Sequence, residues 1–280
     1  MASGLNTLLV FSKVPEPGMV KTRLTREREG WFTQEDASWL FNCMLFDVVE
    51  ACCNALTRLE DADPSQAYRL VISTTPRENL ERMRGLFAES GDWPREILFD
   101  FDEGPDFDTH YNGAFDKCWD AGSDFVLSVG ADLPVLTPED IERGFEKLHE
   151  VCGPDGAGPG VVIAPDQELG VSLIGWSRAT DYDHSGVYYN KEGLTALPAY
   201  VRKAKAAGIP MRYLPPVPDI DTMADLMHAA TVIETLSYCA ESGDCVCAPW
   251  RCADAFRRLG VADPLIPPNA LIDPRDTIDK

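Results

Sequence analysis

The chain has 280 residues, a formal charge of −21 at pH 7 and a pI near 4.5. A protein this acidic repels phosphodiester backbones and anionic membrane surfaces, so we expect no nucleic-acid partner and no membrane insertion. Hydrophobic residues make up 45% of the chain, which is too many for an acidic disordered tail. We therefore expect a folded protein.

The charge is distributed unevenly along the chain. Residues 13–28 contain five basic side chains and two acidic ones, whereas residues 100–142 contain twelve acids and a single base, Lys117. A short basic segment in an acidic protein predicts a small anionic ligand. The acidic block is open to two interpretations, a metal site or a solvated face.

The nine cysteines bear on the compartment. Their odd number and the length of the chain argue against a secreted disulfide scaffold. The apolar segment near the N-terminus is too short for a signal sequence, and no apolar run approaches 18 residues. These features predict a cytoplasmic protein. A metal site in the later cysteine cluster is left open, because the cluster lacks the C-x-x-C pairs of common zinc sites; its members are Cys239, Cys245, Cys247 and Cys252.

Strand-like and helix-like segments alternate along most of the sequence. We expect strands at 6–11, 68–73, 96–101, 124–129, 161–164, 171–175 and 211–214, and helices at 33–59, 76–90, 111–119, from 137, and 194–207. Thr33 and Thr137 are the expected N-caps of two of these helices. Such alternation predicts an α/β fold with a mostly parallel sheet and helices on both faces.

The composition changes toward the C-terminus. From residue 237 onward the sequence contains cysteines and then prolines in place of the alternating pattern. We therefore predict one domain over residues 1–236, followed by a short extension, 237–280, that packs on the domain.

The strongest local feature follows the first expected strand and reads SKVPEPGMVKTRL over residues 12–24. In open α/β sheets ligands bind beyond the carboxyl ends of strands, which is where this segment lies. Gly18 permits a tight turn or a close approach of the backbone. Lys21 and Arg23 offer a point charge and a planar fork to phosphate oxygens. The segment thus predicts a phosphate site.

Two later segments supply carboxylates at the same edge. Asp132 follows an apolar strand, and because Thr137 serves as the next helix cap, Asp132 is free to bind a ligand. Asp219 and Asp221 follow the last strand with strand-like spacing, so one could cap the next helix while the other faces the site. Oxygen donors of this kind beside a diphosphate suit Mg²⁺ or Mn²⁺.

Together, the K-x-P-x-P-G-x-x-K-T-R-L loop, the G-A-D-L-P strand end and the late D-I-D-T segment resemble the nucleotide-diphospho-sugar transferase superfamily of GT-A type. Within it, the sequence is most similar to bacterial glycosyltransferases named for an association with arsenosugar biosynthesis. The resemblance covers about residues 5–235. It implies a GT-A-like three-layer α/β/α sandwich.

The resemblance also implies roles for individual residues. Substrate would contact the basic loop and the later 167–172 segment, through Lys13, Pro17, Gly18, Thr22, Glu168 and Gly170. Lys21, Arg23 and Asp132 would act directly on the reacting diphosphate, and Asp132 and Asp221 would hold the divalent metal.

The sequence departs from the family pattern at two points. Relatives carry E-D-G-G-Y-Y-L-I-G where this chain reads QELGVSLIG at 167–175, so Glu168 would stand in for a missing aspartate. His110, Tyr111 and Asn112 replace a segment that usually carries a basic residue. Trp176, Tyr188 and Tyr189 are candidate residues for a sugar pocket.

Three functions remain open at this point. The first is metal-dependent transfer of a sugar from a nucleoside diphosphate sugar to an unknown acceptor. The second is nucleotidylyl transfer from a nucleoside triphosphate, as in guanylyltransferases, with release of pyrophosphate. The third is nucleotide binding without turnover, which the altered 167–172 segment makes plausible.

Overall fold

The computed structural model describes residues 4–188 and 190–261. Within this part of the chain one sheet of seven strands has the order β3-β2-β1-β4-β6-β5-β7. The strands are β1 (Gly4–Phe11), β2 (Gln66–Thr74), β3 (Ile97–Phe101), β4 (Phe125–Gly130), β5 (Val161–Pro165), β6 (Val171–Ser177) and β7 (Met211–Tyr213). All seven strands expected from the sequence are present, with ends shifted by one or two residues.

The sheet is mixed but mostly parallel, as predicted. The β1–β2, β1–β4, β2–β3 and β5–β7 pairs are parallel, whereas β6 runs antiparallel to both β4 and β5. Since β6 alone among these strands is reversed, the carboxyl ends of the other six share one edge, and the β5–β6 turn lies at that edge too. The loops that follow β1, β4, β5 and β7 therefore converge.

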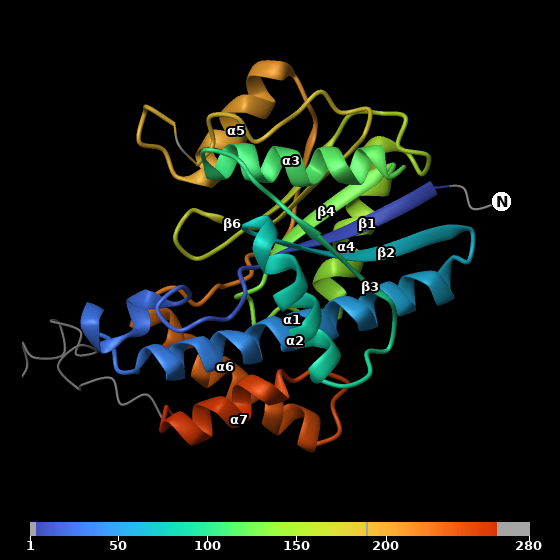
Figure 1. Ribbon diagram of the computed structural model, residues 1–280. Coiled ribbons are helices and arrows are strands. Elements are labelled where there is room, and N and C mark those ends of the chain that lie inside the picture. Colours follow the sequence, from blue (N-terminus) through green and yellow to red (C-terminus); the bar gives the residue numbers. More distant parts are fainter. Residues whose placement is uncertain (1–3, 189, 262–280) are drawn as a thin grey trace, which may run out of the picture.

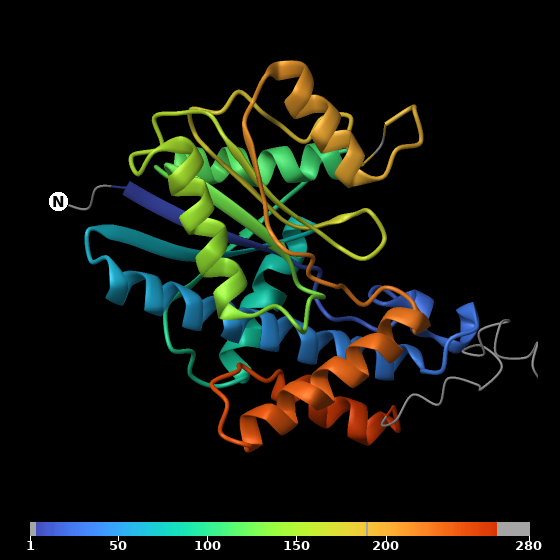
Figure 2. The ribbon, with the colours of Figure 1, turned by 180° about the vertical axis from the view of Figure 1, so that it is seen from behind.

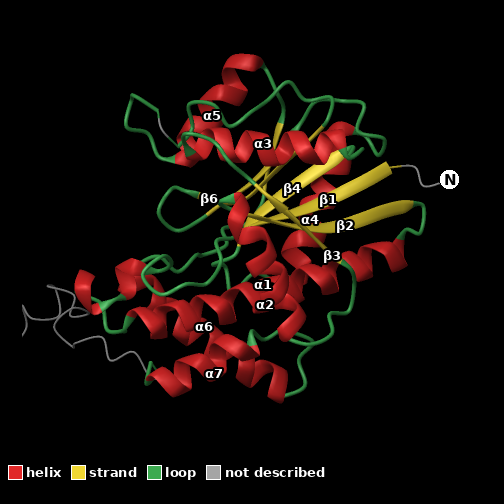
Figure 3. Ribbon diagram, viewed as in Figure 1, coloured by secondary structure: helices red, strands yellow, loops and turns green. Residues whose placement is uncertain are grey.

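Helices cover both faces of the sheet (Figures 1 and 2). They are α1 (Gln34–Ala62), α2 (Leu80–Glu89), α3 (Phe107–Asp120), α4 (Pro138–Cys152), α5 (Ala196–Ala207), α6 (Met223–Glu241) and α7 (Trp250–Leu259). Helices α3 and α5 lie on one face and α1, α2 and α4 on the other, so the strands form a middle layer (Figure 3). The predicted α/β/α sandwich is confirmed.

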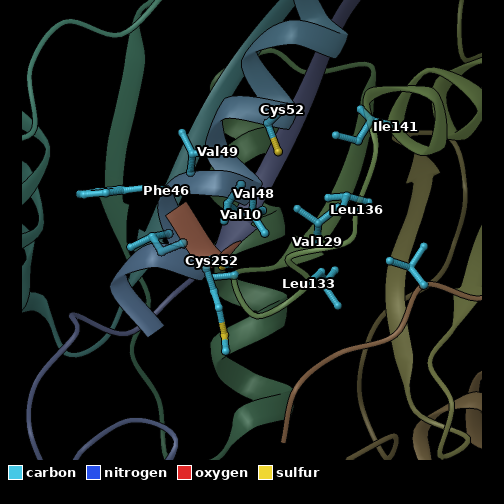
Figure 4. Packing of buried hydrophobic residues seen from close by; sticks show 14 of the residues in the cluster. Val10, Phe46, Val48, Val49, Cys52, Val129, Leu133, Leu136, Ile141 and Cys252 are labelled. Carbon is cyan, nitrogen blue, oxygen red and sulfur yellow. The ribbon is translucent and has the colours of Figure 1, made fainter. Parts of the chain in front are cut away.

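Helix α1 forms the centre of the larger core. Thr33 caps it as expected, in a capping box with Asp36. Side chains of α1, including Val48 and Cys52, belong to one buried cluster with residues of the sheet and of α4 (Figure 4), and Phe46 packs against Phe87 of α2. By length and by a mean hydropathy of 1.3 over its most apolar window α1 could cross a membrane, but 78% of that window is buried inside the protein. Its apolar character is thus explained by core packing.

The described part of the C-terminal segment packs beside α1. The buried carboxylate of Asp47 on α1 accepts hydrogen bonds from the backbone N–H of Cys252 at 2.8 Å and from Arg251 Nη1 at 3.1 Å, both on α7. The predicted boundary between residues 236 and 237 falls inside α6, which continues to Glu241. Residues 262–280 of the predicted extension lie outside the described residues, and the division into domain and extension stays a prediction.

Candidate functional site

The converging loops enclose a pocket of about 810 Å³ at the carboxyl edge of the sheet. Most of its wall comes from the loops after β1, β3, β4, β5 and β7 and from the first turns of α3, and single residues come from α1, from the loop after β2 and from the loop after β6: Phe41, Thr75 and Tyr188. All of its lysines and arginines belong to the loop after β1: Lys13, Lys21 and Arg23. Carboxylates stand on either side of these cations, so the pocket has a basic middle and two acidic ends.

The backbone of the basic loop is shaped for this position. Gly18 has φ = +76°, and a Cβ there would lie 2.8 Å from Gln34 Oε1, so the predicted need for glycine is confirmed. Lys21 also adopts the left-handed conformation, with φ = 46° and ψ = 37°. For a residue with a side chain this costs roughly 1 kcal/mol. The loop bears this strain where it directs the Lys21 side chain into the pocket.

Lys21 connects two carboxylates that are distant in sequence. Its Nζ lies 2.7 Å from Asp132 Oδ2 and 2.8 Å from Asp221 Oδ1, with only 6% of its side chain exposed. Burial by itself lowers the pKa of Lys21, but the two carboxylates outweigh it and raise the pKa above its usual value. Arg23 Nη1 also contacts Asp221, at 3.0 Å. The structure therefore brings together all four of these residues.

A third carboxylate joins this cluster. Oxygen atoms of Asp132, Asp219 and Asp221 all lie within 4.8 Å of one another. Burial, followed by the charges of Asp132 and Asp221, raises the pKa of Asp219 to about 7. Three carboxylates that repel one another and offer only oxygen donors fit a hard divalent cation such as Mg²⁺ or Mn²⁺. The strand-like spacing of residues 219 and 221 indicated that carboxylates from this loop could reach the site, although we expected only Asp221 as a metal ligand there.

The expectation that Asp219 or Asp221 caps the following helix is wrong. Thr222 is the N-cap of α6: its hydroxyl accepts from the Asp225 N–H, and the Asp225 carboxylate accepts from the Thr222 backbone N–H. Because this capping box satisfies the end of the helix, both aspartates are left for the pocket.

The β5–β6 turn supports the cluster from one side. Asp166 Oδ1 accepts from the N–H groups of Glu168 at 2.6 Å and of Gly170 at 2.8 Å. A Cβ at residue 170 would lie 1.9 Å from Asp166 Oδ2, so a larger residue there would displace the carboxylate that holds this turn. Gln167 Nε2 donates to Asp219 Oδ1 and to Asp225 Oδ1, both at 2.8 Å. Gln167 therefore holds the loop after β7 in place, a role that no sequence motif predicted.

The remaining predicted residues divide between the pocket wall and its surroundings. Lys13, Thr22 and Gly170 line the pocket, whereas Pro17, Gly18 and Glu168 are not among its lining residues. In place of the exposed Glu168, its neighbour Asp166 forms part of the wall.

The three aromatic residues considered for a sugar pocket have different positions. Tyr188 lines the pocket, but Trp176 is 2% exposed and packs in the core against Phe115. Tyr189 lies outside the described residues.

The cysteine cluster does not form a comparable site. Among residues 4–188 and 190–261, the aspartate trio is the one group with an arrangement suited to a metal ion. All nine cysteines are unpaired, and Cys252, on α7, is buried in the core.

The opposite end of the pocket holds a pair that the sequence did not reveal. His110 Nδ1 lies 2.6 Å from Asp102 Oδ1, and Asp102 Oδ2 accepts a hydrogen bond from Ser73 Oγ at 2.7 Å. The Asp102 side chain is 3% exposed, while 20% of His110 remains accessible from the pocket.

Comparison with known proteins places this architecture in context. The profile of a sequence family described as "Uncharacterized protein conserved in bacteria (DUF2064)" matches residues 59–191. No curated protein is similar enough to this chain to count as a match.

Among solved structures one shares the fold, and two others are similar at lower TM-scores. A candidate nucleotide-diphospho-sugar transferase from Desulfovibrio desulfuricans G20 is 23% identical, with a TM-score of 0.68 over 92% of this chain and 98% of that one. A 4-diphosphocytidyl-2C-methyl-D-erythritol synthase from Anaerococcus prevotii DSM 20548 is 10% identical, with a TM-score of 0.47 over 83% and 97%. A nucleotidyl transferase from Methanothermobacter thermautotrophicus is 10% identical, with a TM-score of 0.46 over 81% and 95%. The first of these structures establishes that the chain has the nucleotide-diphospho-sugar transferase fold.

Proposed function

We propose that this protein binds a nucleoside diphosphate sugar together with a divalent cation and transfers the sugar to an acceptor. One observation carries the proposal: three cations of a single loop and three carboxylates of two other loops face the same pocket. Cations recognise phosphate oxygens, and clustered carboxylates suit a metal that shares those oxygens. The D. desulfuricans structure, a candidate nucleotide-diphospho-sugar transferase with the same fold, supports the same substrate class.

In this proposal Asp132, Asp219 and Asp221 hold Mg²⁺ or Mn²⁺. When bound, the ion neutralises negative charge on the diphosphate. Lys21 and Arg23 contact phosphate oxygens and stabilise the charge that develops on the departing nucleoside diphosphate. Lys13 is exposed at the mouth of the pocket, and no ion pair joins it to another residue of the described chain. It is therefore available to the same phosphates.

The groups proposed to bind the metal and the phosphate already contact one another. Because Lys21 Nζ lies between Asp132 and Asp221, the lysine and a divalent cation compete for the same carboxylate oxygens. Phosphate binding offers Lys21 a new partner in exchange for these carboxylates. Metal and nucleotide are therefore expected to favour each other's binding.

The proposal keeps the cytoplasmic location expected from the sequence. Nine unpaired cysteines, six of them buried in the core away from the pocket, suit a reducing compartment.

Product analysis tests the proposal. The protein is incubated with Mn²⁺ and either a panel of nucleoside diphosphate sugars or the four nucleoside triphosphates, and products are followed by ³¹P NMR. We expect a nucleoside diphosphate to be released from a sugar donor, with water as a slow acceptor. Asp132→Asn is expected to abolish this release, whereas Glu234→Gln, which removes an exposed charge on α6, should not change it.

Two other outcomes would overturn the assignment. Release of pyrophosphate from a triphosphate would show nucleotidylyl transfer instead. Metal-dependent binding without any product from either panel would show a nucleotide-binding protein without turnover.

A further inference from the structure

The pair formed by Asp102 and His110 occupies the end of the pocket farthest from the aspartate trio. Asp102 follows β3 and His110 lies on the first turns of α3, whereas Asp132 follows β4. In the sheet β3 and β4 are separated by β2 and β1, so their ends are about 14 Å apart at ordinary strand spacing. The basic loop after β1 lies between them. This span accommodates the diphosphate at one end and the nucleoside at the other.

The distance argues against a role in the bond-breaking step. A proton acceptor has to come within hydrogen-bond distance of the reacting group, and that group lies at the metal and phosphate end in the proposed function. The charges around the pair formed by Asp102 and His110 argue against phosphate binding there as well. Asp102 and Asp106 face this end, which has no lysine or arginine among its described lining residues. A neutral group that forms hydrogen bonds therefore fits best.

The hydrogen bond between Asp102 and His110 determines whether His110 presents a hydrogen-bond donor or an acceptor to such a group. Asp102 is a buried carboxylate, which accepts but does not donate, so whenever the His110 imidazole is neutral its single proton lies on Nδ1. Ser73 occupies the other carboxylate oxygen and keeps Asp102 in this orientation. The remaining ring nitrogen, Nε2, then presents a lone pair. In the described chain no hydrogen bond links Nε2 to another residue.

An aromatic ring precedes His110 on α3 by about one helical turn and lines the same pocket. Phe107 is three residues before His110 on α3, lines the same pocket and is 39% exposed. Tyr111 stacks on Phe107 with ring centroids 5.3 Å apart and holds the ring in place. A planar surface next to a directed hydrogen-bond acceptor is the combination that recognises a planar heterocycle by its edge.

On the basis of the proposed function, we propose that Asp102 and His110 select the nucleobase. The base stacks on Phe107 and donates a ring N–H to His110 Nε2. Uracil and guanine carry a ring N–H at the centre of their pairing edge, whereas cytosine and adenine carry a ring lone pair there. The pair therefore favours uridine or guanosine nucleotides and disfavours cytidine and adenosine nucleotides.

Calorimetric titration of the full chain with UDP, GDP, CDP and ADP in the presence of Mn²⁺ tests this selection. We expect UDP or GDP to bind at least about tenfold more tightly than CDP and ADP, the effect of one well-placed hydrogen bond. Pyrophosphate with Mn²⁺ serves as the control for the phosphate and metal end. Its affinity should be the same in every variant at this end of the pocket.

Two variants separate base selection from a purely structural role. In Asp102→Asn the side-chain oxygen can still accept from Ser73, but its amide donates to His110 Nδ1 and moves the imidazole proton to Nε2. We expect the preference to reverse toward CDP and ADP. His110→Asn retains a donor to Asp102 but has no group at the Nε2 position, so the preference should be lost while melting temperature is kept. If Asp102 and His110 only hold the loop after β3 against α3, neither variant should change the preference among nucleotides.

The results also distinguish this inference from the proposed function. If the nucleotides bind with no preference, or if the preference persists in both variants, the base-selection inference is wrong although the phosphate site stands. If neither the nucleotides nor pyrophosphate bind in the presence of Mn²⁺, the proposed function is wrong and the inference fails with it.

Discussion

Replacing Lys21 with methionine tests how the buried lysine and the aspartates depend on each other. Methionine keeps most of the side-chain volume and removes the charge that bridges Asp132 and Asp221 at 2.7 and 2.8 Å. Breaking a fully buried ion pair costs about 3–5 kcal/mol. Asp132 and Asp221 remain 29% and 42% exposed, so water screens part of the effect, and we expect a loss of about 2 kcal/mol.

The variant should respond to ligands in two opposite ways. In a protein of this size a loss of about 2 kcal/mol lowers the melting temperature by roughly 4–8 °C. Mn²⁺ alone should raise the melting temperature more in Lys21→Met than in the wild type, because the lysine no longer competes for the carboxylates. Adding UDP should then give a smaller further rise in the variant, since one phosphate contact is missing.

Differential scanning fluorimetry measures the melting temperature of each variant without ligand, with Mn²⁺, with UDP, and with Mn²⁺ and UDP together. Lys205→Met is the matched control, because it removes an exposed lysine on α5 and should leave every melting temperature unchanged. The reasoning is refuted if Lys21→Met is as stable as the wild type and responds to Mn²⁺ to the same extent.

Three further variants test the surrounding structure. Gly170→Ala places a Cβ 1.9 Å from Asp166 Oδ2 and should lower the free energy of unfolding in urea by about 2 kcal/mol. Asp47→Ala leaves the Cys252 N–H without its acceptor and Arg251 with Glu50 as its remaining carboxylate partner, so we expect a loss of about 2–4 kcal/mol and faster proteolysis of residues 242–249. Burial lowers the pKa of His184 well below its usual value. The unfolded chain therefore binds a proton near pH 6.5 that the folded protein does not, and stability falls with pH below about 6.5. Relative to His184→Gln, the wild type should lose more stability between pH 7 and pH 5, measured as the free energy of unfolding in urea.

Each of these variants has a control or a contrary result. Gly113→Ala, at a helical position with no atom within 4 Å of the added Cβ, should be neutral or slightly stabilising. Asp61→Ala, an exposed acid at the end of α1, should leave proteolysis unchanged. Parallel stability curves for the wild type and His184→Gln from pH 7 to pH 5 would contradict the account of the buried histidine.

Local patterns were enough to predict the layers of the fold and the edge that carries the site. Apolar runs predicted every strand because buried parallel strands are apolar on both faces. Thr33 and Thr137 were predicted as caps because capping depends on residues within one turn. The antiparallel hairpin between β5 and β6 could also have been predicted, because five residues at 166–170 are too few for a parallel crossover.

Contacts between distant residues could not be predicted in this way. Lys21 is 111 residues from Asp132 and 200 residues from Asp221, and no local pattern specifies such contacts. The sequence did place these three residues at one edge, but it could not show that the lysine contacts the carboxylates directly. Asp102 and His110 are only eight residues apart, but their pairing depends on how the loop after β3 folds onto α3, which no local pattern specifies.

The central claim is that the basic loop and the aspartate trio bind nucleotide phosphate and a divalent cation together. Calorimetric titration of UDP in the presence and absence of Mn²⁺ measures this coupling directly. We predict that Mn²⁺ tightens UDP binding by about tenfold or more, within the usual range of coupling between two sites. Asp132→Asn should remove the gain. Equal UDP affinity with and without Mn²⁺ in the wild type, or an equal gain in Asp132→Asn, would contradict the account.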